Sequence, residues 1–221
     1  MNAVDGQTEI VPELPDEITG EVRELLESIG GADALPSVSS LARSMSRNRT
    51  GTLQQLRTLL NDYVEHTLSA VELPAVVRAW QHADRGELRE LLQLDAELRT
   101  DPRMKPFRAA SCAVGRRQLS KLRALKDHRL LQRYLHAVES GEAAGWHAIV
   151  YGIFLSVYSV PVRQGLLHLA RNTIGGLAFN ATHGLGLRLS DSQEVLGELT
   201  DQLPEMANRA LSGHTQMLSV S

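Results

Sequence analysis

The feature that most constrains this chain is an uncharged apolar run at residues 148–158. A helix that is apolar on every side has to be surrounded by other parts of the protein or by lipid. A bilayer span needs about 20 such residues, and Pro161 and Arg163 end this run too early for that. We therefore expect residues 148–158 to form the central helix of a helical domain, with the rest of the chain packed around it.

Two further apolar runs follow, at residues 165–169 and 172–189. The second is rich in Gly and Ala and contains the pairs Gly175/Gly176 and Gly184/Gly186. Inside a helix each Gly costs about 1 kcal/mol relative to Ala, so these positions indicate a close approach between backbones. The sequence leaves open whether that approach occurs within the bundle or across a dimer.

Elsewhere apolar residues recur at helical spacing, and no stretch keeps the period of two that is typical of a strand. Aromatic residues make up only 4% of the chain, which also favours helices. We expect Thr52 to cap one helix, Pro74 to restart another, and Asp191 to cap the last. Residues 16–29 are also expected to be helical. The prediction is an all-α, single-domain bundle of about eight to ten helices, formed by residues 16–211 between a disordered tail at 1–15 and a flexible tail at 212–221.

The overall charge and the cysteine content limit the possible environments and partners. The net charge is −3, which argues against a nucleic-acid-binding protein because such a protein presents a broad cationic face. Cys112 is the only cysteine, so no internal disulfide can form and a reducing compartment is indicated. No apolar segment follows Met1. We expect a cytoplasmic protein without a membrane or nucleic-acid partner.

Motifs for catalysis or cofactor binding are missing from the sequence. It has no phosphate-binding loop, dinucleotide fingerprint, nucleophile elbow or His-Glu-x-x-His motif. His136 and Glu139 share a helix face but are better interpreted as solvated side chains than as metal ligands. Cys112 is better interpreted as an inert core thiol, because no motif places a His beside it. We expect no catalytic residue, no bound cofactor and no metal site.

An alternative hypothesis is a helical enzyme, or a binding protein with a small-molecule pocket inside the bundle. It requires polar side chains that converge in one cavity, and His147, Tyr151 and His168 are the candidates. A basic run between Arg116 and Lys126 could bind phosphate or an acidic partner, although a solvated helix face explains it better.

A series of landmarks follows in order along residues 35–217. They are Leu53, Leu56, Leu59 and Leu60; residues 71–76; 95–99; Phe107, Arg108, Ser111, Gly115 and Leu119; 147–152; Val160 and Pro161; 180–187; 190–196; and 213–216. Their order and spacing resemble the urease accessory protein UreF family. Residues 35–40 lack the glycines of that family's N-terminal motif, and His183 stands where the family has Arg. The chain is thus identified as a diverged member.

The resemblance implies an all-helical adaptor that helps to build the nickel centre of urease. It implies a homodimer that binds a UreH/UreD-type accessory protein, recruits a UreG-type GTPase and acts on apo-urease. The residues expected to contact partners lie in the family's C-terminal motifs: His183, Gly184, Gly186, Gln193 and His214. We expect His183 to lie at a protein surface, and Leu at Gly184 or Gly186 to disrupt assembly more than folding.

Overall fold

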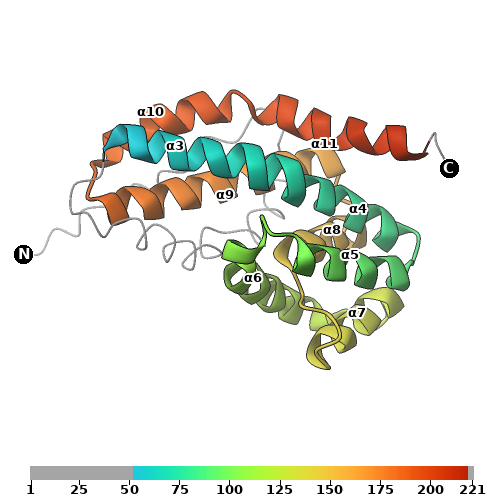
Figure 1. Cartoon of the computed structure of the whole chain (residues 1–221). Helices are drawn as coiled ribbons and strands as arrows, with labels where there is room; N and C mark the ends of the chain where they lie inside the picture. Colours follow the sequence, from blue (N-terminus) through green and yellow to red (C-terminus); the bar gives the residue numbers. More distant parts are fainter. Residues whose placement is uncertain (1–51, 219–221) are drawn as a thin grey trace, which may run out of the picture.

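The computed structural model describes residues 52–218, and every regular element in that range is helical (Figure 1). The predicted tail at 1–15, the predicted helix at 16–29 and the motif at 35–40 lie outside the described residues. The all-α, single-domain class is confirmed. The helices are α3 (Leu53–Tyr63), η2 (Val64–Glu72), α4 (Leu73–Asp84), α5 (Leu88–Thr100), η3 (Lys105–Phe107), α6 (Arg108–Lys121), η4 (Leu122–Ala124), α7 (Arg129–Glu139), α8 (His147–Val157), α9 (Val162–Leu185), α10 (Leu189–Thr200) and α11 (Leu203–Leu218).

The predicted N-cap at Thr52 is confirmed as a capping box. The Thr52 hydroxyl accepts the backbone N–H of Gln55 at 3.2 Å, and the Gln55 side-chain oxygen accepts the N–H of Thr52 at 2.9 Å. Two backbone donors that have no partner inside the helix are satisfied in this way.

The predicted helix start at Pro74 is confirmed, because α4 begins at Leu73 with Pro74 in its first turn; the chain, however, stays helical between α3 and α4. A π-helical segment, η2, joins α3 to α4. Its geometry moves the N–H of Leu73 onto the carbonyl of Leu68, five residues earlier. Proline lacks an N–H and its ring collides with the carbonyl four residues before it. The wider π register accommodates Pro74 without a break, so the number of separate helices differs slightly from the prediction.

The central helix is α8, as predicted. Residues 148–155 are all buried, and α8 packs most extensively against α4 and α6. Gly152 allows the approach to α4, because a Cβ there would lie 2.6 Å from the backbone oxygen of Val76. Gly115 allows a similarly close approach between α6 and the start of α8, because a Cβ there would lie 2.1 Å from the carbonyl oxygen of Gly145. The backbones therefore meet closely around α8.

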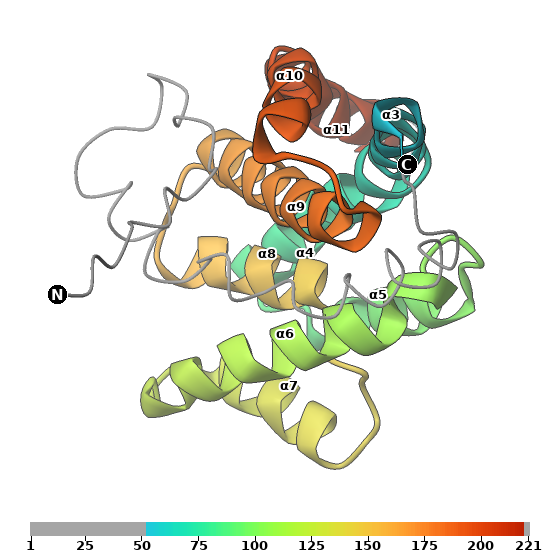
Figure 2. The same cartoon turned by 90° about the vertical axis from the view of Figure 1, so that its left-hand side faces the viewer.

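The helices form two groups on either side of α4 and α8 (Figures 1 and 2). On one side α3, α9, α10 and α11 contact one another, and on the other side lie α5, α6 and α7. α4 contacts α9 and α11 in the first group and α5 in the second group. It therefore connects the two halves of the core. None of the described helices is long and apolar enough to cross a bilayer.

Helix α9 unites two runs that the sequence analysis separated. Residues 165–169 and 172–189 were expected as distinct segments, but one helix covers Val162–Leu185. The residues between them are Ala170 and Arg171, and Arg171 interrupts the apolar pattern without ending the helix, although its side chain is buried. A polar interruption therefore did not mark a boundary here.

The last predicted helix is two helices, α10 and α11, with a break at residues 201–202. Asp191 does cap α10, but from its third position: its carboxylate accepts the backbone N–H of Arg188 at 3.2 Å, and the helix begins at Leu189. The α11 helix continues to Leu218, beyond the expected domain end at residue 211. The flexibility of the C-terminal tail stays a prediction.

Candidate partner-contact surface

The candidate site lies where the end of α9 turns into α10. Several residues there are exposed, and four of them are what we call the contact surface: Phe179, His183, Gly186 and Gln193. Phe179 and His183 are one helical turn apart, and their rings meet edge to face with centroids 4.6 Å apart. Phe179 is 44% exposed, and among the described residues only Tyr158 is a comparably exposed large hydrophobic side chain.

The structure places three of the five predicted partner residues on this surface. His183 is exposed at the end of α9, as expected, and Gln193 is exposed on α10. Whether they bind a partner stays a prediction. The surroundings of Gly184 and the side chain of His214 lie outside the part of the chain that the structure describes. The sequence analysis did not single out Phe179, although it is the one aromatic residue in the run at 172–189.

Close packing within the bundle does not explain Gly186. Nothing lies within 4 Å of the position that its Cβ would occupy, and its φ is +67°. It ends α9 in a Schellman motif: the N–H of Gly186 bonds to the carbonyl of His183, and that of Leu187 to the carbonyl of Thr182. Glycine is favoured there because a left-handed backbone is unfavourable for residues with a Cβ.

Ion pairs hold α10 against α3 and so fix the second half of the contact surface. Arg57 on α3 donates to Glu198 at 2.8 Å and to Glu194 at 3.1 Å. These hydrogen bonds raise the pKa of the Arg57 guanidinium above its ordinary value, with Glu198 contributing most. The pairs lie on the surface, so they orient α10 more than they stabilise it.

The three polar side chains required by the enzyme hypothesis do come together. The Tyr151 hydroxyl lies 2.9 Å from Nδ1 of His168 and 3.1 Å from the carbonyl oxygen of Gly165, and Nε2 of His168 lies 3.0 Å from Nδ2 of Asn172. The His147 ring contacts Tyr151 edge to face at 5.8 Å. These distances fit one proton arrangement, in which Asn172 donates to His168, His168 donates to Tyr151, and Tyr151 donates to Gly165.

Two members of this cluster are buried, whereas His147 and Asn172 are half-buried. Tyr151 and His168 are each 1% exposed. Burial raises the pKa of the Tyr151 hydroxyl far above its ordinary range, and burial beside His168 lowers the pKa of His147 to about 4. At neutral pH both groups are therefore uncharged. The buried hydrogen bond between Tyr151 and His168 is suited to fixing α8 against α9.

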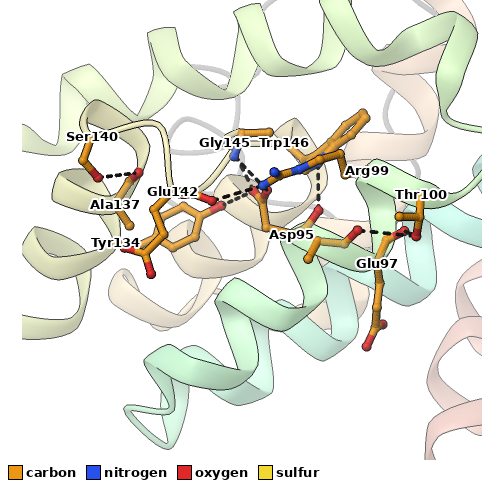
Figure 3. A network of polar contacts seen from close by, with 12 residues as sticks. Asp95, Glu97, Arg99, Thr100, Tyr134, Ala137, Ser140, Glu142, Gly145 and Trp146 are labelled. Atoms are coloured by element: carbon orange, nitrogen blue, oxygen red, sulfur yellow. Dashed lines mark hydrogen bonds and ion pairs between the residues drawn. The ribbon is translucent and has the colours of Figure 1, made fainter.

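A second buried network, centred on Asp95 of α5, holds the loop that leads into α8 (Figure 3). The fully buried carboxylate accepts the backbone N–H groups of Ala144 at 2.7 Å and Gly145 at 3.0 Å, and the Tyr134 hydroxyl at 3.1 Å. Arg99 lies 3.6 Å away as its counter-ion. Burial and the nearby Asp95 charge raise the pKa of Tyr134 well above its ordinary value. Sequence analysis could not identify this role, because Asp95 is simply one acidic residue in a charged helix.

The other candidates for chemistry are occupied or buried. Glu139 pairs with Arg123 rather than with His136. Cys112 is buried, and burial, followed by the Asp95 charge, raises the pKa of its thiol, so the reactive thiolate is disfavoured. Within residues 52–218 no three His, Cys, Asp or Glu side chains gather in a way that could hold a metal ion.

The described residues thus form an all-α domain in which Phe179 exposes apolar area beside His183, a feature that protein-binding surfaces often share. The UreF family model matches residues 51–200, about two thirds of the chain. The chain therefore belongs to the UreF family, a family of urease accessory proteins rather than enzymes. No curated protein matches the chain.

Proposed function

We propose that this chain is a cytoplasmic, homodimeric adaptor in the assembly of the urease nickel centre. It binds a UreH/UreD-type accessory protein, recruits a UreG-type GTPase, and so brings nickel to apo-urease. Nickel is the cargo of this assembly, and we assign no nickel ligand to this chain. The single observation that carries the proposal is the match to the UreF family over residues 51–200.

The contact surface supplies the physical means of binding. Phe179 exposes apolar area that a partner can cover, and His183 adds a hydrogen-bonding group beside it. Aromatic residues that become buried at the centre of an interface often provide most of its binding energy. The capped end of α9 and the Arg57 ion pairs keep this surface in place before a partner arrives.

The proposal is tested by capture of UreH/UreD-type and UreG-type proteins on the full chain. We expect the native chain to retain both proteins. Phe179→Ala should weaken binding of the UreH/UreD-type protein by about tenfold or more. The matched control is Tyr158→Ala, because Tyr158 is 40% exposed and its ring also rests on a neighbour, Phe154, at 4.5 Å. Equal losses in the two variants would show that the contact surface is misplaced. A native chain that captures neither protein would contradict the adaptor function.

Gly186→Leu is a poor test of contact because the positive φ at this position makes Leu costly for the fold itself. Gln193→Arg is better, since Gln193 is exposed on α10 and lies outside the turn. We expect Gln193→Arg to reduce capture while the melting temperature stays unchanged. Unchanged capture would remove Gln193 from the proposed interface.

We also infer that the chain is not an enzyme. The family is one of accessory proteins, and two of the three side chains that an active site would have needed, Tyr151 and His168, are buried and hydrogen-bonded to each other. Turnover of a substrate by the purified chain alone would contradict this inference.

A further inference from the structure

A groove between α5 and α7 is not used by the proposed function. It encloses about 760 Å³ and is lined by Leu88, Arg89, Leu92, Gln132, Arg133, His136, Ala137 and Glu142. Ala137 is buried, while Leu88 and Leu92 are half-buried and pack against the core, so these three form an apolar floor. Arg89, Arg133 and His136 are exposed and belong to the same lining.

The two arginines of the groove have no carboxylate partner among the described residues, whereas several other described arginines do. Arg78, Arg103 and Arg123 each pair with a carboxylate. Arg89 and Arg133 make no such pair with any described residue. Glu142 is the only acidic residue among those that line the groove, and Gln132 is held by the backbone oxygens of Arg123 and Leu125. The groove thus combines an apolar floor with an excess of positive charge.

The chain itself contains a segment of complementary composition. Between residues 13 and 29 there are six acidic residues and one basic residue: Glu13, Asp16, Glu17, Glu21, Glu24 and Glu27 against Arg23. Apolar residues in the same segment recur at helical spacing, at Val22, Leu25, Leu26 and Ile29. Such a segment offers an apolar stripe to the floor and carboxylates to the arginines at the rim.

We propose that the acidic segment at residues 13–29 docks in the α5–α7 groove of its own chain. Residues 30–51 connect it to α3, and 22 residues can extend to about 70 Å. A domain of this size is about 40 Å across, so the groove is within reach. A tether of this length gives an effective concentration of order 1 mM, so even a weak ionic contact is substantially occupied. The segment occupies the groove through its carboxylates and its apolar stripe.

The test uses zero-length cross-linking, which joins a carboxylate only to an amine in direct contact. Arg89→Lys and Arg133→Lys keep the charge and supply that amine in the full-length chain. We expect mass spectrometry to find both introduced amines linked to acidic residues of the segment. The matched control is Arg129→Lys, because Arg129 is exposed on the same helix as Arg133 but does not line the groove. Its cross-link yield should be at least about fivefold lower, as expected for a tethered contact rather than a random one.

Two further arms identify the occupant. Mixing chains of normal and heavy nitrogen separates links within one molecule from links between two, and links between two molecules would overturn the proposal in favour of a second copy. Glu21→Gln, Glu24→Gln and Glu27→Gln together should lower the links at the remaining carboxylates of the segment by at least about fivefold, because the ionic contact is weakened. Circular dichroism should show that the helices remain. Links at position 129 equal to those at 89 and 133, or no link to the segment at all, would also overturn it.

Discussion

Asp95 accepts the backbone N–H of Ala144 at 2.7 Å, although 49 residues separate them in the chain. This bond attaches α5 to the loop before α8, and the side-chain N–H of Trp146 adds a second attachment by donating to the backbone oxygen of Asp95 at 3.2 Å. Because the loop fixes where α8 begins, the position of the central helix depends on one buried carboxylate.

Replacing that carboxylate should be costly. In Asp95→Ala the hydroxyl of Tyr134 and the N–H groups of Ala144 and Gly145 lose their acceptor inside the protein. We expect a loss of about 3–5 kcal/mol in the free energy of unfolding, measured in urea. Asp95→Asn should lose less, because its side-chain oxygen still accepts one of the three bonds. Glu90→Gln on the same helix is the control and should change the stability little; a similarly small effect of Asp95→Ala would contradict the anchoring role.

Two Gly→Ala changes in helices should have opposite effects. A Cβ at Gly152 would lie 2.6 Å from the backbone oxygen of Val76, so Gly152→Ala should force α8 away from α4 and destabilise the fold by about 1–3 kcal/mol. Nothing lies within 4 Å of the Cβ position at Gly197 in α10, so Gly197→Ala should stabilise it by about 0.5–1 kcal/mol. Thermal melting of both variants checks this, and equal shifts would show that the α4–α8 contact is looser than described.

His147 should make the fold sensitive to acid. Its pKa in the folded protein is about 4, below the ordinary value of 6.5, so the unfolded chain binds the extra proton first as the pH falls. Stability should therefore decrease between pH 6.5 and pH 4, by about 1–3 kcal/mol from this residue. His147→Gln should flatten that part of the stability curve, while His66→Gln at an exposed position should leave it unchanged. Parallel curves for the native chain and His147→Gln would contradict the prediction.

The buried pair of Tyr63 and Glu72 should act in the opposite direction. The Tyr63 hydroxyl, at the end of α3, donates to the Glu72 carboxylate at the end of η2, and burial raises the pKa of Glu72 above its ordinary value. The folded protein therefore holds this proton more tightly than the unfolded chain does, and stability from this group decreases as the pH rises above about 4.5.

Glu72→Gln keeps an acceptor for Tyr63 without the ionisable group. We expect it to be more stable than the native chain at pH 8 and little different at pH 4, as measured by urea unfolding at both values. Tyr63→Phe removes the donor from Glu72 and should lose about 1–3 kcal/mol at pH 8. If Glu72→Gln were less stable than the native chain at pH 8, the carboxylate would be contributing favourably in its ionised form.

Part of the site could be predicted from the sequence. The exposed position of His183 followed from the order of motifs in residues 180–196. The sequence also indicated correctly that the backbone at Gly186 favours glycine. The cause was assigned to close packing, whereas the positive φ at the end of α9 explains it. Phe179 was counted as one more apolar residue, because a pattern of residue types does not say which side of a nearly uniform apolar helix faces solvent.

The sequence by itself determined the helical class, the central position of α8 and the cap at Thr52, because these follow from local composition, spacing and hydrogen bonding along one segment. The tertiary structure alone decided that Asp95 holds the loop before α8, that His147, Tyr151 and His168 come together, and that a π-helical segment joins α3 to α4. These features depend on contacts between segments far apart in the chain, or on the choice between nearly equal backbone registers. Neither is encoded in the residues of one segment alone.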